Sequence, residues 1–337
     1  MARLGNPVGI VGIGSYVPDK VLTNADLEKL VDTTDAWIVE RTGIRERRIA
    51  ASEQATSDLA VEAGKKALAD AGVSPEEIDL VLVATCTPDM PIAATACIVQ
   101  TKLGCNRAAA FDLVAACSGF VYGMEMAAGL IASGVYKTIL VIGAEAMSRF
   151  TDYQDRNTCV IFGDGAGAVV LKTVEQGFGL LGTHLGAQDG TELLKVHAGG
   201  SRCPATEETV KNKQHYLFMN GHEVYKFAVK IMGEASLKAL AVAGIGADEL
   251  DWLIPHQANI RIIQAAAKRL KMPMDKVIVN VDRYGNTSAA SIPMAMDEAY
   301  RSGRLKHGDL MVVVGFGAGL TWAASVIKWS KGGNNIG

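Results

Sequence analysis

The sequence has few aromatic residues, little unbalanced charge and no long uninterrupted apolar run. Only 6% of its 337 residues are aromatic, and its formal net charge is −3. This near balance of charge gives no reason to expect a nucleic acid or a membrane surface as a partner. The most apolar stretch, about 108–133, contains Asp112, Glu125 and several glycines, so it predicts a buried strand and helix rather than a membrane span.

Metal-binding and redox signatures are also missing from the sequence. The six cysteines include no CxxC pair, and no two of the six histidines stand at metal-ligand spacing with a third ligand nearby. We therefore expect no metal and no permanently bound cofactor. The N-terminal segment has only a short apolar stretch broken by glycine and proline, so it does not resemble a signal peptide. Cysteines that are not exported stay reduced, which predicts a cytoplasmic location.

The chain contains an internal repeat. Residues 62–80 align without a gap on residues 234–252, and ten of the nineteen positions are identical. Each copy reads as a helix that ends at Ala-Gly, a charged turn and an apolar strand. In the first copy, Ser74 and Glu77 fit a capping box around Pro75, which indicates the start of a short helix. Ten identities in the same order of elements make chance a poor explanation.

A second similarity extends the repeat to the whole chain. Residues 163–171 resemble residues 315–327, and we expect each half to close with a glycine-rich turn and a strand. A chain of this length is longer than most single domains, so a duplicated fold is a natural interpretation. We therefore predict two homologous α/β halves, about 1–175 and 176–337.

Cys117 is the first candidate catalytic residue. Residues 108–114 read as a strand, and an apolar helix is predicted to begin directly after the cysteine. A thiol at a helix N-terminus lies near the positive end of the helix dipole, which favours the nucleophilic thiolate. A buried and inert cysteine is the commoner alternative, and this segment alone does not decide between the two.

His256 and Asn286 are two further candidates. His256 follows an expected strand at 251–254 and is predicted to open a helix, whereas its counterpart in the first copy of the repeat is Ala84. The carboxyl end of a strand is the usual edge for a site in an open α/β sheet, although a structural histidine is commoner. Asn286 lies in a segment that reads as a strand, a glycine turn and a helix, where asparagine is normally present for the backbone angles it tolerates.

These three residues stand in motifs that resemble one known family. CSGF from Cys117, PHQANIRI from Pro255 and YGNTSAAS from Tyr284 are similar to the β-ketoacyl-[acyl carrier protein] synthase III family of the thiolase superfamily. The resemblance extends over essentially the whole chain and includes the segments 33–50, 162–171 and 315–322. It implies an α/β fold, a thiolase-like five-layered αβαβα duplication of two similar halves, and a homodimer.

The resemblance also implies a reaction. An acyl-CoA starter, such as acetyl-CoA, would acylate Cys117, and malonyl-acyl carrier protein would then lose CO2 and attack the acyl group. His256 and Asn286 would donate hydrogen bonds to the enolate oxygen that decarboxylation creates. The backbone N–H groups of Cys117 and Ala318 would form the oxyanion hole, and Phe316 would keep the site dry. The β-ketoacyl product would start a fatty acid.

Further site residues follow from the resemblance alone. Trp37 and Arg156 would stack on either side of the adenine of CoA, because a planar guanidinium stacks where an ammonium group does not. The other CoA contacts would be Thr33, Arg41, Gly221, His222, Ala258 and Asn259. Docking of the carrier protein would use Gln257, Arg261, Lys226, Lys268 and Arg269. For Lys268 and Arg269 a solvated helix end is the alternative, since cations are favourable there anyway.

One departure from the family pattern leaves the starter open. After CTPD the family often has a Phe-Pro pair whose Phe enters the partner subunit's acyl pocket, whereas this chain offers Met90 or Ile92. A straight, branched or longer starter therefore stays possible.

Other proteins of this superfamily are the competing interpretations. The nearest are condensing enzymes of the polyketide or quinolone type, which also use Cys, His and Asn. A thiolase would need a second cysteine in the late glycine-rich loop, and an elongating synthase would need a histidine at position 286. Hydroxymethylglutaryl-CoA synthase would need an acid in the site, and a non-catalytic protein on this fold would be expected to lack one of the three residues.

Overall fold

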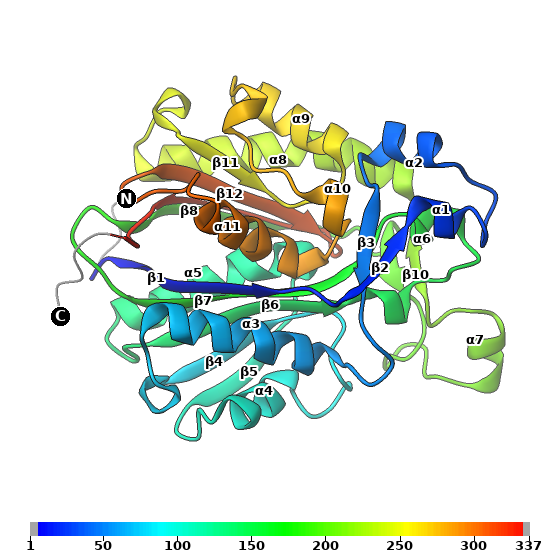
Figure 1. Ribbon diagram of the computed structural model, residues 1–337, viewed down its shortest axis with the longest axis horizontal. Coiled ribbons are helices and arrows are strands. Elements are labelled where there is room, and N and C mark those ends of the chain that lie inside the picture. Colours follow the sequence, from blue (N-terminus) through cyan, green and yellow to red (C-terminus); the bar gives the residue numbers. More distant parts are fainter. Residues whose placement is uncertain (1–5, 333–337) are drawn as a thin grey trace.

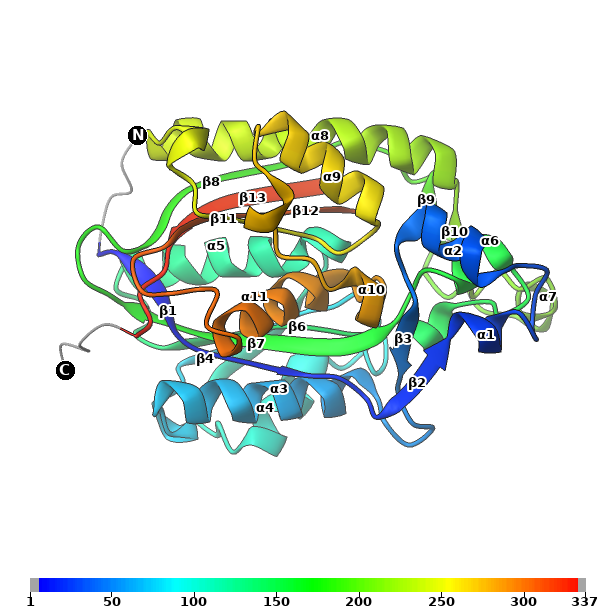
Figure 2. The same cartoon turned by 45° about the horizontal axis from the view of Figure 1, so that its top comes forward.

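The computed structural model describes residues 6–332, which form five layers. The helices of the three helical layers are α3 (Thr56–Ala71), α4 (Thr95–Leu103), α5 (Gly119–Ala132), α8 (Gly221–Ala243), α9 (Ile260–Arg269) and α11 (Ser291–Arg301). α3 and α4 cover the outer face of one sheet, and α8 and α9 cover the outer face of the other (Figure 1). α5 and α11 lie between the two sheets (Figure 2). This arrangement confirms the expected αβαβα fold.

The two sheets come from successive parts of the chain. The first has the order β1-β7-β6-β4-β5, and the second has the order β11-β12-β13-β8. The strands of the first are β1 (Val8–Tyr16), β4 (Leu80–Ala84), β5 (Ala109–Leu113), β6 (Ile139–Ala146) and β7 (Asp164–Thr173). Those of the second are β8 (Gly179–Ala187), β11 (Trp252–Pro255), β12 (Leu310–Gly317) and β13 (Thr321–Lys328). β4 is parallel to both β5 and β6, and β11 is parallel to β12. β4 and β6 are buried along their whole length, as their continuous apolar sequences predict.

Smaller elements gather at one end of the layers, on the right of Figure 1. They are the strand pair β2 (Lys20–Thr23) and β3 (Glu46–Ile49), the pair β9 (Leu194–Val196) and β10 (Leu217–Met219), and the short helices α1 (Asn24–Leu27), α2 (Asp35–Thr42), α6 (Arg156–Cys159), α7 (Glu207–Lys211) and α10 (Val281–Tyr284).

The repeat seen in the sequence recurs in the structure. α3 and α8 both end at a glycine in the left-handed conformation, Gly72 with φ 64° and Gly244 with φ 70°. Short 3₁₀ turns follow at Pro75–Glu77 and Ala247–Glu249, and they lead into β4 and β11 respectively. Left-handed φ is accessible to glycine at little cost, which explains why both copies carry Ala-Gly there.

The prediction of a glycine-rich turn at the end of each half is only partly correct. Glycines 165 and 167 were expected in a turn, but they lie within β7, whereas Gly319 does lie in a turn between β12 and β13. A Cβ added to Gly167 would come within 2.7 Å of Pro293, and one added to Gly165 within 2.8 Å of the sulfur of Met294. These glycines are therefore in the strand because α11 packs directly against it.

Two local expectations around the candidate residues are wrong. His256 does not open a helix, because α9 begins at Ile260, where the side chain of Asn259 accepts a hydrogen bond from the Arg261 N–H. The segment before Gly285 is not a strand. It forms the short helix α10, and isolated bridges flank it on both sides, between Leu253 and Val277 and between Phe162 and Asn286.

Candidate active site

The structure brings Cys117, His256 and Asn286 to one cavity of ≈ 470 Å³. They come from three places: the turn between β5 and α5, the loop after β11, and the turn after α10. The carboxyl ends of parallel strands of both sheets therefore converge on the cavity, as expected for an α/β site. Other sequence-predicted residues that line it are Trp37, Arg41, Gly221, His222, Ala258, Asn259, Phe316 and Ala318.

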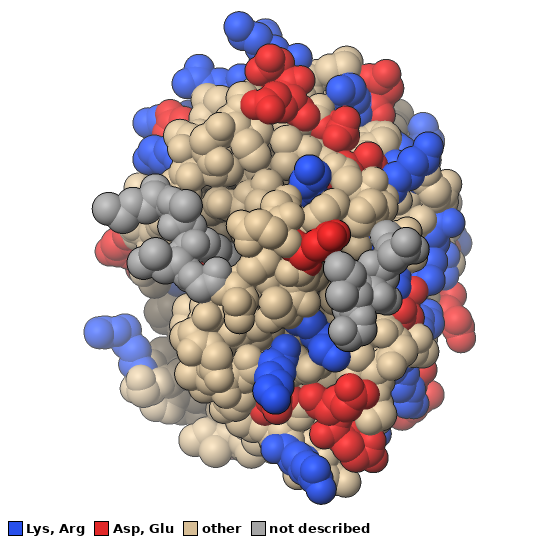
Figure 3. All heavy atoms as spheres, turned by 90° about the vertical axis from the view of Figure 1, so that its left-hand side faces the viewer, with Lys and Arg blue, Asp and Glu red and all other residues tan. Residues whose placement is uncertain are grey.

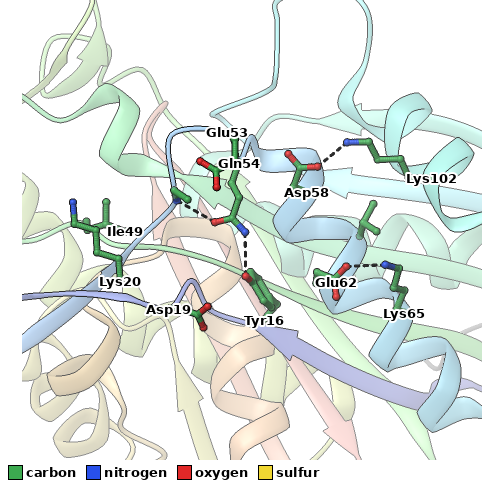
Figure 4. A pocket seen from close by; sticks show the side chains of 12 residues that line it. Tyr16, Asp19, Lys20, Ile49, Glu53, Gln54, Asp58, Glu62, Lys65 and Lys102 are labelled. Atoms are coloured by element: carbon green, nitrogen blue, oxygen red, sulfur yellow. Dashed lines mark hydrogen bonds and ion pairs between the residues drawn. The ribbon is translucent and has the colours of Figure 1, made fainter.

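A second hollow of ≈ 880 Å³ lies elsewhere and carries none of the predicted site residues. Its wall is charged, and its cations are partly neutralised: Lys65 pairs with Glu62 at 2.7 Å, and Lys102 pairs with Asp58 at 2.7 Å (Figure 4). It contains no cysteine or histidine. The smaller cavity is therefore the candidate active site.

Cys117 lies in a tight turn at the start of α5. A 3₁₀ turn spans Ala116–Ser118, and Ala116 has a φ of 44°. The thiol is buried, and burial raises the pKa of Cys117 to about 12. This direction is opposite to the one expected from the helix start, because the loss of water around the sulfur outweighs the favourable dipole. The resting group at neutral pH is therefore a thiol.

The backbone of Cys117 is approached closely by the loop after β12. A Cβ added to Gly317 would lie 2.5 Å from the Cys117 nitrogen and 2.8 Å from Ala116 Cβ. Glycine at 317 therefore allows this loop, with Ala318, to lie beside the Cys117 N–H. Thr321 ties the loop to the turn, since its hydroxyl lies 3.0 Å from the Ala115 carbonyl and 3.2 Å from the Ala318 carbonyl.

His256 is held so that one ring nitrogen faces the cavity. Its Nδ1 lies 2.6 Å from the hydroxyl of Ser291, and its backbone N–H donates to the Val314 carbonyl at 2.7 Å. Its Nε2 is buried and has no hydrogen-bond partner within residues 6–332. Burial lowers the pKa of His256 to about 3, so the imidazole is neutral at physiological pH. The ring of Phe316 lies edge-on to it at 5.9 Å.

Asn286 is fixed by its neighbours on both sides. Its backbone N–H donates to the Ile161 carbonyl at 2.9 Å, and its own carbonyl accepts from the Gly163 N–H at 3.0 Å. The side-chain oxygen accepts a hydrogen bond from the Ser288 N–H at 2.8 Å. This bond orients the amide, so that its NH2 group is the end free to donate to a molecule in the cavity.

The expected adenine pair is in contact at the cavity mouth. The guanidinium of Arg156 lies 5.3 Å from the centre of the Trp37 ring, and that of Arg41 lies 4.5 Å from it. Arg156 itself does not line the cavity, and neither does Thr33, whose hydroxyl is buried without a partner in the described part of the chain. Asn259 joins the two sides of the mouth by donating to the Arg41 carbonyl at 2.7 Å.

The expected carrier-protein residues divide into one buried and four exposed side chains. Gln257 is only 1% exposed, and its amide bonds the backbone of Pro255, Ile278, Asn280 and Val281. Docking through Gln257 is therefore wrong, because the side chain holds the loop after β11 in place. The exposed residues are Lys226, Arg261, Lys268 and Arg269, all on α8 or α9.

Two buried site residues were not found from the sequence. Ser291, which holds His256, is the last residue of the YGNTSAAS motif, but the motif alone indicated no role for it. Glu145 is a fully buried carboxylate near the end of β6. In the sequence it would have been noticed only as an acid at the end of an apolar run.

Among residues 6–332, no group of three or more His, Cys, Asp or Glu side chains is arranged to hold a metal ion. No helix in the same range is long and apolar enough to cross a membrane.

The fold and the site define a condensing enzyme of the thiolase type, that is, an acyltransferase. Residues 111–189 match the family described as 3-oxoacyl-[acyl-carrier-protein] synthase III, and residues 240–329 match its C-terminal part. The chain belongs to this family, which is also called β-ketoacyl-[acyl carrier protein] synthase III. These matches confirm the resemblance seen in the sequence.

Individual relatives agree with this assignment. The β-ketoacyl-[acyl-carrier-protein] synthase III of Desulfitobacterium hafniense is 61% identical over 327 residues, which cover 97% of this chain and 99% of the relative. That of Caldanaerobacter subterraneus is 59% identical over 325 residues, or 96% and 98% of the two chains. The crystal structure of 3-oxoacyl-[acyl-carrier-protein] synthase III from Aquifex aeolicus superposes with a TM-score of 0.88 at 46% identity, covering 96% of this chain and all of that one.

Proposed function

We propose that this protein condenses a short acyl-CoA, such as acetyl-CoA, with malonyl-acyl carrier protein. The products are a β-ketoacyl-carrier protein, CoA and CO2, and the reaction starts fatty-acid synthesis in the cytoplasm. The observation that carries this proposal is the convergence of a cysteine, a neutral histidine and an oriented asparagine amide on one cavity. Polyketide- or quinolone-type chemistry is the alternative, and the products distinguish it.

In the first half-reaction Cys117 attacks the thioester and releases CoA. The sulfur forms a bond to the carbonyl carbon, and the carbonyl oxygen gains negative charge in the tetrahedral adduct. The Cys117 N–H and the neighbouring Ala318 N–H are the donors for this oxygen, which the close approach at Gly317 supports.

In the second half-reaction the malonyl group loses CO2, and its carbanion attacks the carbonyl carbon of the acyl group on Cys117. The carbon–sulfur bond to Cys117 then breaks. The negative charge that decarboxylation creates lies on the malonyl thioester oxygen. Two neutral donors suit it, the unpartnered Nε2 of His256 and the NH2 group of Asn286. The Nε2 carries its proton when Nδ1 accepts from the Ser291 hydroxyl. The Gln257 N–H donates to the same hydroxyl oxygen and leaves the hydroxyl proton free for Nδ1.

CoA and the carrier protein reach the cavity from the end where α2 and α6 lie. Trp37, Arg41 and Arg156 form the adenine site, and Arg156 must separate from the Trp37 ring to admit the base. Lys226, Arg261, Lys268 and Arg269 form the basic docking surface. On the described part of the face at the opposite end of the molecule, side chains of both charge signs are mixed (Figure 3).

A homodimer forms through the free edge of the first sheet. Among residues 6–332, β5 pairs only with β4, so its outer edge has backbone groups without a partner in that range. Apolar side chains surround this edge, with Phe111 39% exposed, Val114 76% and Ile92 90%. A second copy on this edge would bury them and would bring Ile92 towards the partner's cavity, where it limits the starter chain.

The reaction is tested by product analysis. Acetyl-, isobutyryl- and hexanoyl-CoA are each mixed with malonyl-carrier protein, and β-ketoacyl-carrier protein and CO2 are measured. One β-ketoacyl product and one CO2 per turnover support the proposal. Release of free polyketides or quinolones instead would favour the alternative, and absence of any condensation would refute both.

A further inference from the structure

A buried carboxylate lies close to the candidate nucleophile and has no role in the chemistry described so far. Glu145 has no exposed surface. Its oxygens accept hydrogen bonds over 2.5–3.2 Å from the hydroxyls of Thr85, Thr87 and Ser288, from the thiol of Cys86 and from the backbone N–H groups of Cys86 and Thr87. All of these donors are neutral. A carboxylate buried among neutral donors is unusual enough to suggest a function.

Ser288 connects this carboxylate to the active site. Its hydroxyl donates to Glu145 Oε1 at 2.9 Å, while its backbone N–H orients Asn286. Ser288 has a left-handed φ of 48°, which is costly for a residue other than glycine. It lines the cavity together with Cys117. Burial raises the pKa of the Cys117 thiol, and the nearby Ser288 hydroxyl offsets only part of this rise. The serine is therefore the link between the nucleophile and the carboxylate.

Acylation needs an acceptor for the thiol proton, because the resting Cys117 is protonated. His256 is a poor acceptor, since burial lowers its pKa to about 3. Glu145 is a better acceptor than His256, because burial raises the pKa of its carboxyl group and so increases its affinity for a proton.

We propose that Ser288 and Glu145 form a proton relay that takes the proton of Cys117 while its sulfur attacks the thioester. The proton moves from Sγ to Ser288 Oγ as Ser288 passes its own proton to Glu145 Oε1, and the freed electron pair forms the bond to the carbonyl carbon. When the adduct collapses, the bond to the CoA sulfur breaks and the leaving thiolate takes the proton back through Ser288. Reactants and products then carry the same number of protons. The relay rests on the acyl transfer proposed above.

Two other titratable groups near Glu145, Cys86 and Asp164, take no part in the relay. Cys86 donates to Glu145, and burial raises its pKa, so it is not an acceptor. Asp164 on β7 is also buried, but it pairs in register with Ala146, the residue after Glu145. Its side chain therefore points to the other face of the sheet, where it bonds Ala50 and Ser148. Asp164→Asn is thus a matched control that removes a buried carboxylate outside the relay.

The test is the pH dependence of Cys117 alkylation by iodoacetamide, which needs no acyl transfer. Peptide mass spectrometry must follow Cys117 itself, because Cys86 lines the same cavity. In the relay the reactive form, with the proton moved from Cys117 to Glu145, has as many protons as the resting form. Its population is therefore independent of pH between the pKa values of the two groups. Without the relay the proton goes to solvent, and the rate rises about tenfold per pH unit below the thiol pKa.

The relay predicts a plateau in the wild-type rate at pH values above the pKa of Glu145 and below that of Cys117. Glu145→Gln and Ser288→Ala should each replace the plateau by the tenfold rise, and each should slow acylation by acyl-CoA about 100-fold at neutral pH. Asp164→Asn should keep the plateau. A tenfold rise per pH unit in the wild type, or a plateau that survives in Ser288→Ala, would overturn the relay while leaving acyl transfer at Cys117 untouched. If Glu145→Gln does not fold, Ser288→Ala decides alone.

Discussion

The substitution Gly317→Ala tests whether the loop after β12 supplies the oxyanion site. The added Cβ would lie 2.5 Å from the Cys117 nitrogen, and real Cβ atoms essentially never come closer than 3.0 Å to such an atom. The loop or the cysteine turn must therefore move by at least half an ångström (3.0 − 2.5). A misplacement of about 1 Å at a reacting centre costs about a hundredfold in rate, and loss of one oxyanion donor costs about a hundred- to a thousandfold. We expect acylation of Cys117 to slow by about a hundredfold.

The matched control for this experiment is Gly129→Ala in α5, the helix that follows the nucleophile. A Cβ at Gly129 meets nothing within 4 Å. Alanine should therefore stabilise the helix by about 0.5–1 kcal/mol and leave acylation unchanged. Acylation is measured by rapid-quench mass spectrometry, and folding by thermal unfolding. Wild-type acylation in a folded Gly317→Ala protein would refute the oxyanion argument.

Four further predictions concern the second half-reaction, the docking surface and the starter. His256→Ala and Asn286→Ala should slow malonyl decarboxylation by about a hundred- to a thousandfold but acylation much less. Because burial lowers the pKa of His256 to about 3, wild-type decarboxylation should show no step near pH 6.5 in a pH–rate profile. Arg261→Glu should raise KM for malonyl-carrier protein about tenfold, and by a smaller factor in high salt. It should leave KM for malonyl-CoA unchanged. The control Lys65→Glu, a charge reversal at a distant position, should not raise KM for malonyl-carrier protein. If Ile92 limits the partner's pocket, Ile92→Phe should lower kcat/KM for hexanoyl-CoA about tenfold relative to acetyl-CoA, and an unchanged ratio would remove Ile92 from that role.

The elements and motifs were largely predictable because they depend on local sequence. β4 (Leu80–Ala84) is the apolar strand expected at the end of the first repeat copy, and the capping box around Pro75 begins the expected short helix, which is a 3₁₀ turn. The internal repeat predicted the duplicated fold because the same Ala-Gly helix ends occur in both copies. The motif residues Cys117, His256 and Asn286 meet in one cavity as their family pattern implies.

Features that depend on long-range packing were not predictable. The thiol pKa of Cys117 reflects burial by segments far away in the chain, and this burial outweighs the local helix dipole. Gln257 was expected to take part in docking, but its amide bonds the backbone of Ile278, Asn280 and Val281. Glu145 and Ser288 are 143 positions apart, so their contact leaves no local pattern.

The most direct test of the proposed chemistry is the intact mass of the protein before and after each substrate. Incubation with acetyl-CoA should add one acetyl group per chain, peptide mapping should place it on Cys117, and malonyl-carrier protein should then remove it. Cys117→Ser should gain no acetyl group, because a hydroxyl here lacks the nucleophilicity of the thiolate. Acetylation of another cysteine, such as Cys86 in the same cavity, or an acetyl group that malonyl-carrier protein does not remove, would contradict the account.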